Sequence, residues 1–196
     1  MKNLLRITVG IMGLILIPQL LYSQKYPKNF RRAKDKKVEI TAELNMLKSS
    51  HHTQFTGGSM VVDYKALKYF SFGAGAEFSY CNYNINNGFD LSNLKFIPLF
   101  ADARFSYPIG KTVVPYLRLS SGASFASYTR KEEFLPSKPV KFQEIDLYFL
   151  AAGGLSLKTK SGFNPFVEVG YKNYNMSFGK PNVNPQGLAF SWGIVF

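Results

Sequence analysis

From residue 38 to the end of the chain, apolar and polar residues alternate with a period of two. The clearest run is 70–80, where even positions are Phe, Ala or Tyr and odd positions are Ser, Gly or Glu. Similar runs occupy 38–46, 97–107, 115–126, 144–158, 167–172 and 187–196. A weaker pattern over 53–65, with a bend or bulge marked by Gly57 and Gly58, supplies one more strand. The sequence therefore predicts eight strands, each with one apolar face.

The connections between these strands alternate in length. The predicted short turns are Lys65–Lys68, Pro108–Val113 and Lys160–Asn164. The predicted long loops are Asn82–Asn93, Thr129–Lys141 and Met176–Pro185, and Lys48–His52 is a short exception on their side. Short turns on one rim and long loops on the other are typical of an outer-membrane barrel. We call these the short-turn rim and the long-loop rim.

Alternation alone does not decide which face points inward, because a soluble lipocalin-like barrel turns its apolar face inward. Two features favour the opposite orientation. The polar face is rich in Gly and Ser, which suit a crowded interior, and the aromatic residues of the apolar face gather near strand ends, as two interfacial girdles require. The predicted fold is all-β, an eight-stranded antiparallel up-and-down transmembrane β-barrel over 38–196.

The last strand, 190–196, alternates apolar residues and stops at a terminal Phe. This ending resembles the C-terminal signature that the barrel assembly machinery reads in bacterial outer-membrane proteins. The resemblance implies that the assembly signal consists of Phe190, Trp192, Ile194 and Phe196. Over 38–196 the chain resembles the small eight-stranded barrels grouped as porin-family proteins, with shapes like outer-membrane proteins A and X. That family resemblance implies a bacterial outer-membrane location, both mature termini periplasmic, and contact with outer-membrane lipid and lipopolysaccharide.

The chain begins with features of a signal peptide over 1–23. Lys2 and Arg6 precede the apolar run Ile7–Ile17, which is shorter than the roughly 20 residues that a retained anchor needs. A basic leader follows over 24–37, with seven positive residues and one negative. The net charge of +12 is therefore mostly a property of these first segments. We expect no nucleic-acid partner for an exported chain; a solvated linker or attraction to anionic headgroups remain as interpretations of the leader.

Candidate chemistry is sparse. A single cysteine, Cys81, excludes an internal disulfide, and two histidines, His51 and His52, are too few for a histidine-based metal centre. We expect no cofactor. The cluster 49–53 (Ser-Ser-His-His-Thr) offers hydroxyls and imidazoles but no acid nearby in sequence, so we expect no enzyme. Cys81 is predicted to face inward near the outer rim.

The inward face carries charges of both signs. The predicted lumen set is Glu39, Glu43, Glu77, Asp102, Arg104, Arg118, Glu144, Asp146, Glu168 and Lys172, with Lys95 and Lys158 joining near the rims. Buried charges need partners, so one interpretation is a set of ion pairs that closes the lumen. The surplus of acids leaves a narrow cation-preferring pore as the alternative. A structural or surface-interaction role, such a pore, and a component of a protein-translocation assembly with an extracellular or secretion-system partner are the three functional hypotheses.

Overall fold

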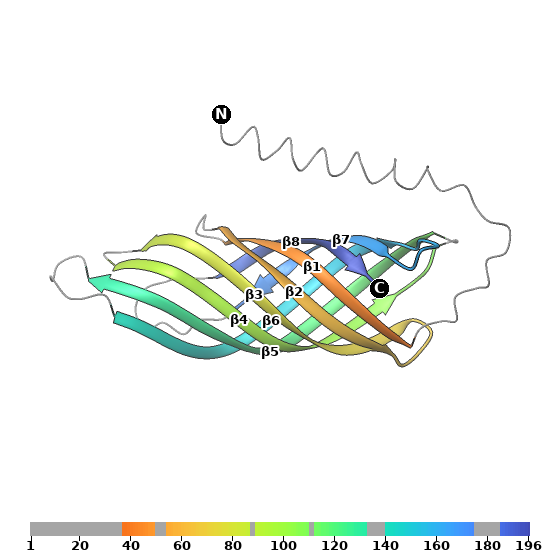
Figure 1. The fold of residues 1–196 in the computed structure, drawn as a ribbon, viewed down its shortest axis with the longest axis horizontal. Helices are drawn as coiled ribbons and strands as arrows, with labels where there is room; N and C mark the ends of the chain where they lie inside the picture. The colour runs from red at the N-terminus through yellow and green to blue at the C-terminus, as the bar shows by residue number, and fades with distance from the viewer. Residues whose placement is uncertain (1–36, 50–53, 87–88, 110–111, 133–139, 175–184) are drawn as a thin grey trace, which may run out of the picture. The chain divides into compact units, whose positions relative to one another are not determined.

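The computed structural model describes residues 37–49, 54–86, 89–109, 112–132, 140–174 and 185–196. Within them lie eight strands: β1 (Val38–Ser49), β2 (Gln54–Lys65), β3 (Phe70–Asn86), β4 (Phe89–Ser106), β5 (Val113–Glu132), β6 (Val140–Leu157), β7 (Asn164–Asn173) and β8 (Gln186–Val195). Each strand pairs antiparallel with the next, and β8 pairs with β1, so the sheet closes into a barrel (Figure 1). The predicted fold is confirmed. The predicted signal peptide and all of the leader except Lys37 lie outside the described residues.

The pairing is staggered around the ring. If one starts at Lys65 on β2 and moves from each residue to its paired residue on the next strand, one returns to β2 after a full circuit of the barrel. The circuit ends at Phe55, ten residues from Lys65. Such a stagger accompanies strands tilted by roughly 35–45°, and the tilt is visible in Figure 1. An eight-stranded barrel of this kind has an interior that side chains can fill.

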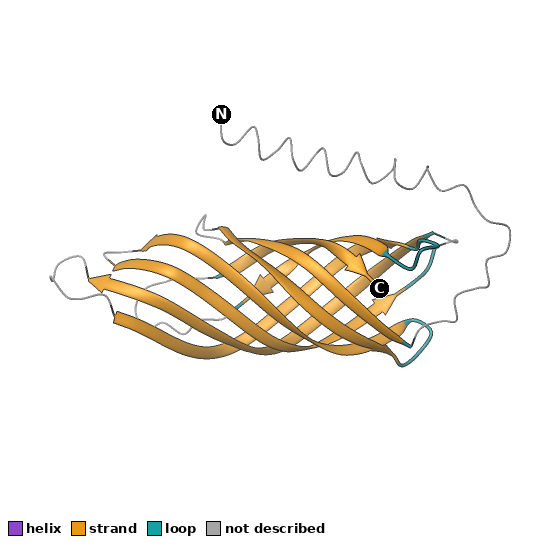
Figure 2. Cartoon of the chain, viewed as in Figure 1, coloured by secondary structure: helices purple, strands orange, loops and turns teal. Residues whose placement is uncertain are grey.

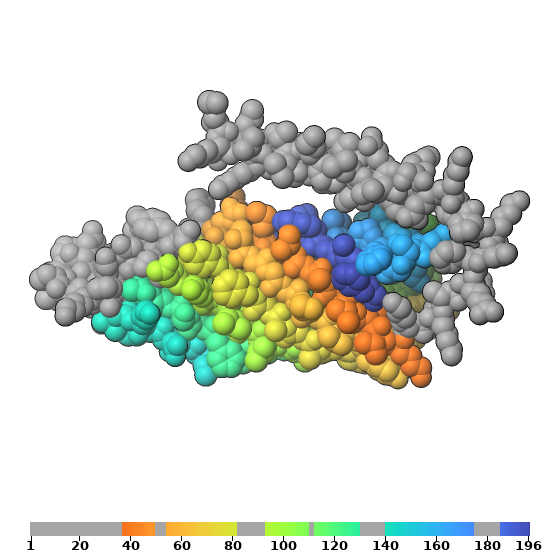
Figure 3. Space-filling model, in the orientation of Figure 1, coloured from red at the N-terminus to blue at the C-terminus, as the bar shows by residue number. Residues whose placement is uncertain are grey.

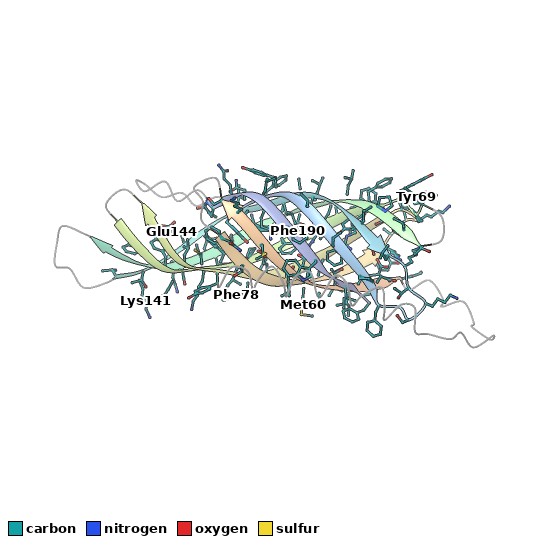
Figure 4. All side chains as sticks on the ribbon, turned by 90° about the horizontal axis from the view of Figure 1, so that it is seen from above. Met60, Tyr69, Phe78, Lys141, Glu144 and Phe190 are labelled. Atoms are coloured by element: carbon teal, nitrogen blue, oxygen red, sulfur yellow. The ribbon has the colours of Figure 1, made fainter. Side chains whose placement is uncertain are left out.

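The two faces of the wall differ as the sequence predicts. Outward Leu44 and Leu119 are each 56% exposed, whereas inward Thr41 and Arg118 are buried. Met60 and Phe190, labelled in Figure 4, both lie on the outer surface. An apolar exterior around a polar interior is the arrangement of a barrel whose outer solvent is lipid. No helix in the described part of the chain is long and apolar enough to cross a membrane, and Figure 2 shows strands joined by loops.

Glycines on the inward face make room for aromatic rings. A Cβ atom at Gly75 would collide with the ring of Phe100, and one at Gly154 would collide with the ring of Tyr116. The inward face is rich in glycine because a narrow lumen that contains large aromatic rings has no space for a side chain at every position.

Four strands are longer than the others. Strands β3 to β6 have 17 to 20 residues, whereas β1, β2, β7 and β8 have 10 to 12. The excess lies at the long-loop rim and forms a four-stranded projection, which we call the extension (81–86, 89–94, 128–132 and 140–148) (Figure 1). Membrane strands need about 9–11 residues, so the shorter strands suffice to cross and the extension stands beyond them.

The extension corrects two predicted loops. Most of 82–93 is not a loop, because β3 continues to Asn86 and β4 begins at Phe89. Thr129–Glu132 and Val140–Lys141 are likewise in strands, and the rest of that loop, with 50–53 and 175–184, lies outside the described residues. These segments are polar because they lie beyond the apolar band, and polarity alone gave the pattern of a loop. A register shift interrupts the ladder between Ser92 and Lys95, where Asn93 adopts a φ of 56°.

The barrel closes between its first and last strands. Figure 3 shows β8, in blue, lying against β1, in orange. Beyond β8, the backbone N–H of Phe196 donates to the carbonyl of Ile40 at 2.8 Å. The four residues of the predicted assembly signal all point outward from this strand, each 37–44% exposed. The final residue is therefore part of the hydrogen-bonded seam.

Candidate functional site

Arg118 of β5 is the centre of the first charged cluster in the lumen. Its Nε donates to Asp102 at 2.7 Å, and its Nη1 donates to Glu43 at 2.8 Å and to Glu168 at 3.3 Å. Ser59 donates to Glu43, and Ser120 donates to Asp102. The guanidinium thus joins β1, β4 and β7 to β5, and its planar fork suits several carboxylates better than an ammonium would.

Glu77 of β3 is the centre of the second cluster. Its carboxylate receives hydrogen bonds from Lys172 at 2.8 Å and from Tyr148 at 3.3 Å. Tyr174 and Ser79 also donate to Glu77. This buried carboxylate is surrounded by a cation and three hydroxyls, and these contacts offset the free-energy cost of removing it from water.

Both clusters cross the barrel. In the ring of eight strands, β1 lies opposite β5 and β3 lies opposite β7. The pair Arg118–Glu43 joins the first two walls and the pair Lys172–Glu77 joins the other two. All four side chains are at most 1% exposed. These two ion pairs, which we call the crossed struts, join different pairs of opposite walls inside the lumen.

An apolar layer of buried side chains lies in the lumen toward the long-loop rim. The rings of Phe96 and Tyr174 stack at a centroid distance of 4.5 Å, and Phe55 packs edge-on against Phe96 at 5.6 Å. Leu47 and Leu94, each 1% exposed, belong to the same cluster. We call Leu47, Phe55, Leu94, Phe96 and Tyr174 the apolar plug.

The short-turn half of the lumen is built differently. On the side of β5, β7 and β8, Tyr116, Phe166 and Val195 form a small apolar cluster. The guanidinium of Arg104 lies over the Tyr116 ring at 4.9 Å. Asp63 of β2, which is 1% exposed, occupies the same half of the lumen. This end therefore combines apolar rings with buried charges of both signs.

The structure brings most of the predicted lumen set together, and the remaining members lie at the rims. Glu39 forms an ion pair with Lys65 at 2.7 Å near the short-turn rim. Glu144 accepts a hydrogen bond from Tyr128 at 2.9 Å in the extension, where the inward Asp146 is half-buried. Lys95 and Lys158 do not join the lumen. Lys95 stands at an outward position of β4 and Lys158 is exposed after β6.

Sequence reasoning missed several lumen residues. Asp63 and Lys65 stand at odd positions of β2, which the alternation already assigns to the inward face, but the weak pattern of this strand hid them. Tyr148 was on the predicted inward face and received no role, and Tyr174 lies just past the end of β7. Their hydroxyls matter because they surround Glu77, which only the barrel geometry reveals.

Of the candidate chemical groups singled out from the sequence, the structure describes only Ser49 and Cys81. Ser49 ends β1 as a buried inward residue, whereas 50–53, with both histidines, lie outside the described residues. Cys81 is buried on the inward face. In the part of the chain that is described, no three His, Cys, Asp or Glu side chains are placed to hold a metal ion.

No protein-family model and no curated protein matches the chain. Among solved structures, it is similar to Ail, the attachment invasion locus protein of Yersinia pestis, with 13% identity over 81% of this chain and 96% of that chain and a TM-score of 0.48. It is also similar to Neisserial surface protein A, with 14% identity over 81% of this chain and 92% of that chain and a TM-score of 0.49. The N-terminal β-barrel domain of Pseudomonas aeruginosa OprF is 15% identical over 81% of this chain and 96% of that chain, with a TM-score of 0.46. At these identities nothing about the role of this chain is carried over from them.

Proposed function

We propose that the chain is a non-enzymatic barrel of the bacterial outer membrane, with a plugged lumen and a structural or surface-interaction role. The observation that carries this proposal is the pair of crossed struts, Arg118–Glu43 and Lys172–Glu77, beneath the apolar plug. Ions would have to break fully buried ion pairs and then displace packed rings. Breaking one buried pair costs about 3–5 kcal/mol, which opposes spontaneous conduction.

The extension supports the surface-interaction part of the proposal. The β2–β3 ladder ends at Thr56 and Tyr80, and the β6–β7 ladder begins at Phe149 and Asn173. Beyond these points the four strands of the extension continue without β2 and β7 beside them. These additional strand residues on the long-loop rim are not needed to span the membrane. A projection held together by hydrogen bonds can present side chains to a partner outside the cell.

The narrow cation-preferring pore is the second candidate function. Its support is the surplus of acids, because five buried carboxylates (Glu43, Asp63, Glu77, Asp102 and Glu168) stand against three buried cations (Arg104, Arg118 and Lys172). In the arrangement described, however, each of those carboxylates except Asp63 receives a hydrogen bond from a cation. We therefore rank the pore below the plugged barrel.

Single-channel recording separates the two functions. Residues 24–196 are refolded into planar bilayers, and folding is checked by heat-modifiable gel mobility. The plugged barrel is expected to give no stable current steps. Reproducible cation-selective steps from protein shown to be folded would overturn the proposal in favour of the pore.

The role of the extension is tested with a shortened variant. Cys81 pairs with Leu94 across β3 and β4, and Tyr128 pairs with Phe142 across β5 and β6. Residues 82–93 and 129–141 can therefore each be replaced by an Asn-Gly turn, which suits a two-residue hairpin. We expect the shortened barrel to fold and insert normally but to lose cross-links to external protein in the native cell. Identical cross-links from both proteins would argue against an interface on the extension.

The same cells test the location. We expect the protein in the outer-membrane fraction, with an epitope placed in the leader protected from external protease in intact cells. Cleavage of that epitope in intact cells would contradict periplasmic termini.

A further inference from the structure

Buried polar atoms without partners lie on both sides of the Arg118 cluster, and more of them lie in the short-turn half of the lumen; Asn45 Nδ2, Ser124 Oγ and Glu144 Oε2 lie toward the long-loop rim. Both carboxylate oxygens of Asp63, and the Nε and Nη2 atoms of Arg104, have no hydrogen-bond partner among the described residues. The two residues are only 1% and 5% exposed. The Thr41 hydroxyl and one oxygen of Asp102 are in the same state. Since an unsatisfied buried polar group costs about 1–3 kcal/mol, such groups in proteins are nearly always satisfied, by protein or by ordered water.

The carboxylate of Asp63 takes the place that a side chain at residue 73 would occupy. In the β-sheet register Gly73 stands directly between Asp63 of β2 and Asp102 of β4. A Cβ atom at Gly73 would collide with Oδ1 of Asp63. The carboxylate of Asp63 therefore leans across a position with no side chain, toward a strand that carries both Asp102 and Arg104. Donors and acceptors are mixed around this space, which is the environment that a buried water requires.

The wall of this half-lumen is polar on one side only. Strands β1 to β4 place Glu39, Lys65, Ser71 and Ser106 between the rim and Asp63, and the side chains of Glu39 and Lys65 are 21% and 38% exposed. Strands β5, β7 and β8 place Tyr116, Phe166 and Val195 on the other side. Water therefore has a polar route along β1–β4 and meets apolar side chains on β5, β7 and β8.

We propose that the short-turn half of the lumen is a dead-end chamber of ordered water. Its entrance is lined by Glu39, Lys65, Ser71 and Ser106, its water solvates Asp63 and Arg104, and it ends at the Arg118 cluster. The long-loop half, which contains the apolar plug, is dry. This inference depends on the proposed plugged lumen. It also explains how the surplus of buried carboxylates can be solvated by water although no channel passes through the barrel.

Two thiols test the chamber. Thr41 is 0% exposed and its hydroxyl has no described partner, whereas the native Cys81 is 6% exposed in the cluster that contains the apolar plug. We compare the Thr41→Cys, Cys81→Ser double variant with the unchanged protein, both folded in nanodiscs. Silver ion is the probe because it travels with water and binds thiolates. Native mass spectrometry follows its uptake.

If the chamber is hydrated, silver uptake at position 41 should be at least tenfold faster than at Cys81. The exposed fractions of the two side chains alone would predict the opposite order, because Thr41 is less exposed than Cys81. Uptake at neither thiol, or at Cys81 alone, would overturn the chamber. Fast uptake at both would overturn the dry long-loop half, whereas the plugged lumen is tested separately by the single-channel recording. If the Thr41 variant does not fold, Ser71→Cys with Cys81→Ser replaces it, since Ser71 lies on the same strand as Cys81 with the same 6% exposure.

A spectroscopic measurement on the unchanged protein excludes the remaining explanation, a direct dry contact between Asp63 and Arg104. We expect the Nε–H proton of Arg104 to show a magnetization-transfer cross-peak to water in nanodiscs. A coupling of that proton to the Asp63 carboxylate, with no water cross-peak, would show a direct ion pair and overturn the chamber.

Discussion

The Nζ atom of Lys172 on β7 lies 2.8 Å from Oε2 of Glu77 on β3, the opposite wall of the barrel. The two residues are 95 positions apart in sequence and both are buried. This ion pair therefore depends on the barrel being closed, and in turn it fixes the distance between two strands that are not paired with each other in the sheet. Its contribution is best measured by removing each partner and then both.

We expect Lys172→Met to lower the free energy of unfolding by about 3 kcal/mol, because it leaves the Glu77 carboxylate buried without a cation. The double variant with Glu77→Gln should be less destabilised than the sum of the two single variants. Urea titration of the refolded barrel, followed by heat-modifiable gel mobility, provides the four values. Additive effects within about 0.5 kcal/mol would mean that the pair is not coupled.

Arg118→Met should be more damaging than Lys172→Met. The guanidinium neutralises Glu43, Asp102 and Glu168 at once, so its loss leaves three buried carboxylates, and we expect a cost of at least about 3–5 kcal/mol. Arg118→Lys should recover only part of it, since a single ammonium cannot reproduce the fork.

The control for Arg118 is Lys95→Met, because Lys95 is an exposed outward cation that forms no ion pair with another described residue. We expect a change within about 0.5 kcal/mol. If Arg118→Met behaved like Lys95→Met in the same urea titration, the crossed struts would not hold the barrel together.

Two adjacent glycines on β6 separate the effect of a crowded lumen from that of an open surface. Gly154 faces inward, and a Cβ atom there would collide with the ring of Tyr116. Gly153 faces outward, and its nearest contact would be an ordinary 3.6 Å to Leu117. We expect Gly154→Ala to cost about 1–3 kcal/mol and Gly153→Ala to be neutral or stabilising by about 0.5 kcal/mol. The reverse order in the folding titration would contradict the packing described for the lumen.

The lipid-facing wall is tested with a charge. Leu119 points outward from the middle of β5 and is 56% exposed, so Leu119→Arg should cost roughly 2–4 kcal/mol if it sits near the bilayer midplane, and Phe149→Arg should behave alike. The control is Gln143→Arg, an exposed position in the extension, with an expected cost near zero. At the neighbouring inward position, Ser120→Arg is expected to block folding because Ser120 is 2% exposed beside Asp102. Equal tolerance at 119 and 143 would contradict the membrane assignment.

The alternation of residues was sufficient to predict the strand number and the direction of each face, because lipid outside and a narrow lumen inside impose opposite demands on successive positions. The extension was predicted only in part: 144–148 belong to a predicted strand, whereas the ends of β3, β4 and β5 were missed because polar residues such as those around Asn82 give the pattern of a loop. The alternation also predicted that Glu77 and Lys172 point inward, but it did not predict that these two residues form an ion pair. Which inward residues meet depends on the stagger between strands, and the sequence carries no direct signal of it.

Deletion of Phe196 tests the seam between the first and last strands. Its backbone N–H donates to the Ile40 carbonyl at 2.8 Å, and its ring packs edge-on against Phe163 at 5.3 Å. Removing the residue therefore deletes a hydrogen bond of the β1–β8 closure and one aromatic contact at the short-turn rim. We expect a several-fold lower amount of folded barrel in the membrane fraction of cells, measured by heat-modifiable mobility. Phe196→Tyr keeps the backbone and the ring and should assemble normally, so equal membrane levels for the deletion and this control would show that assembly does not depend on the final residue.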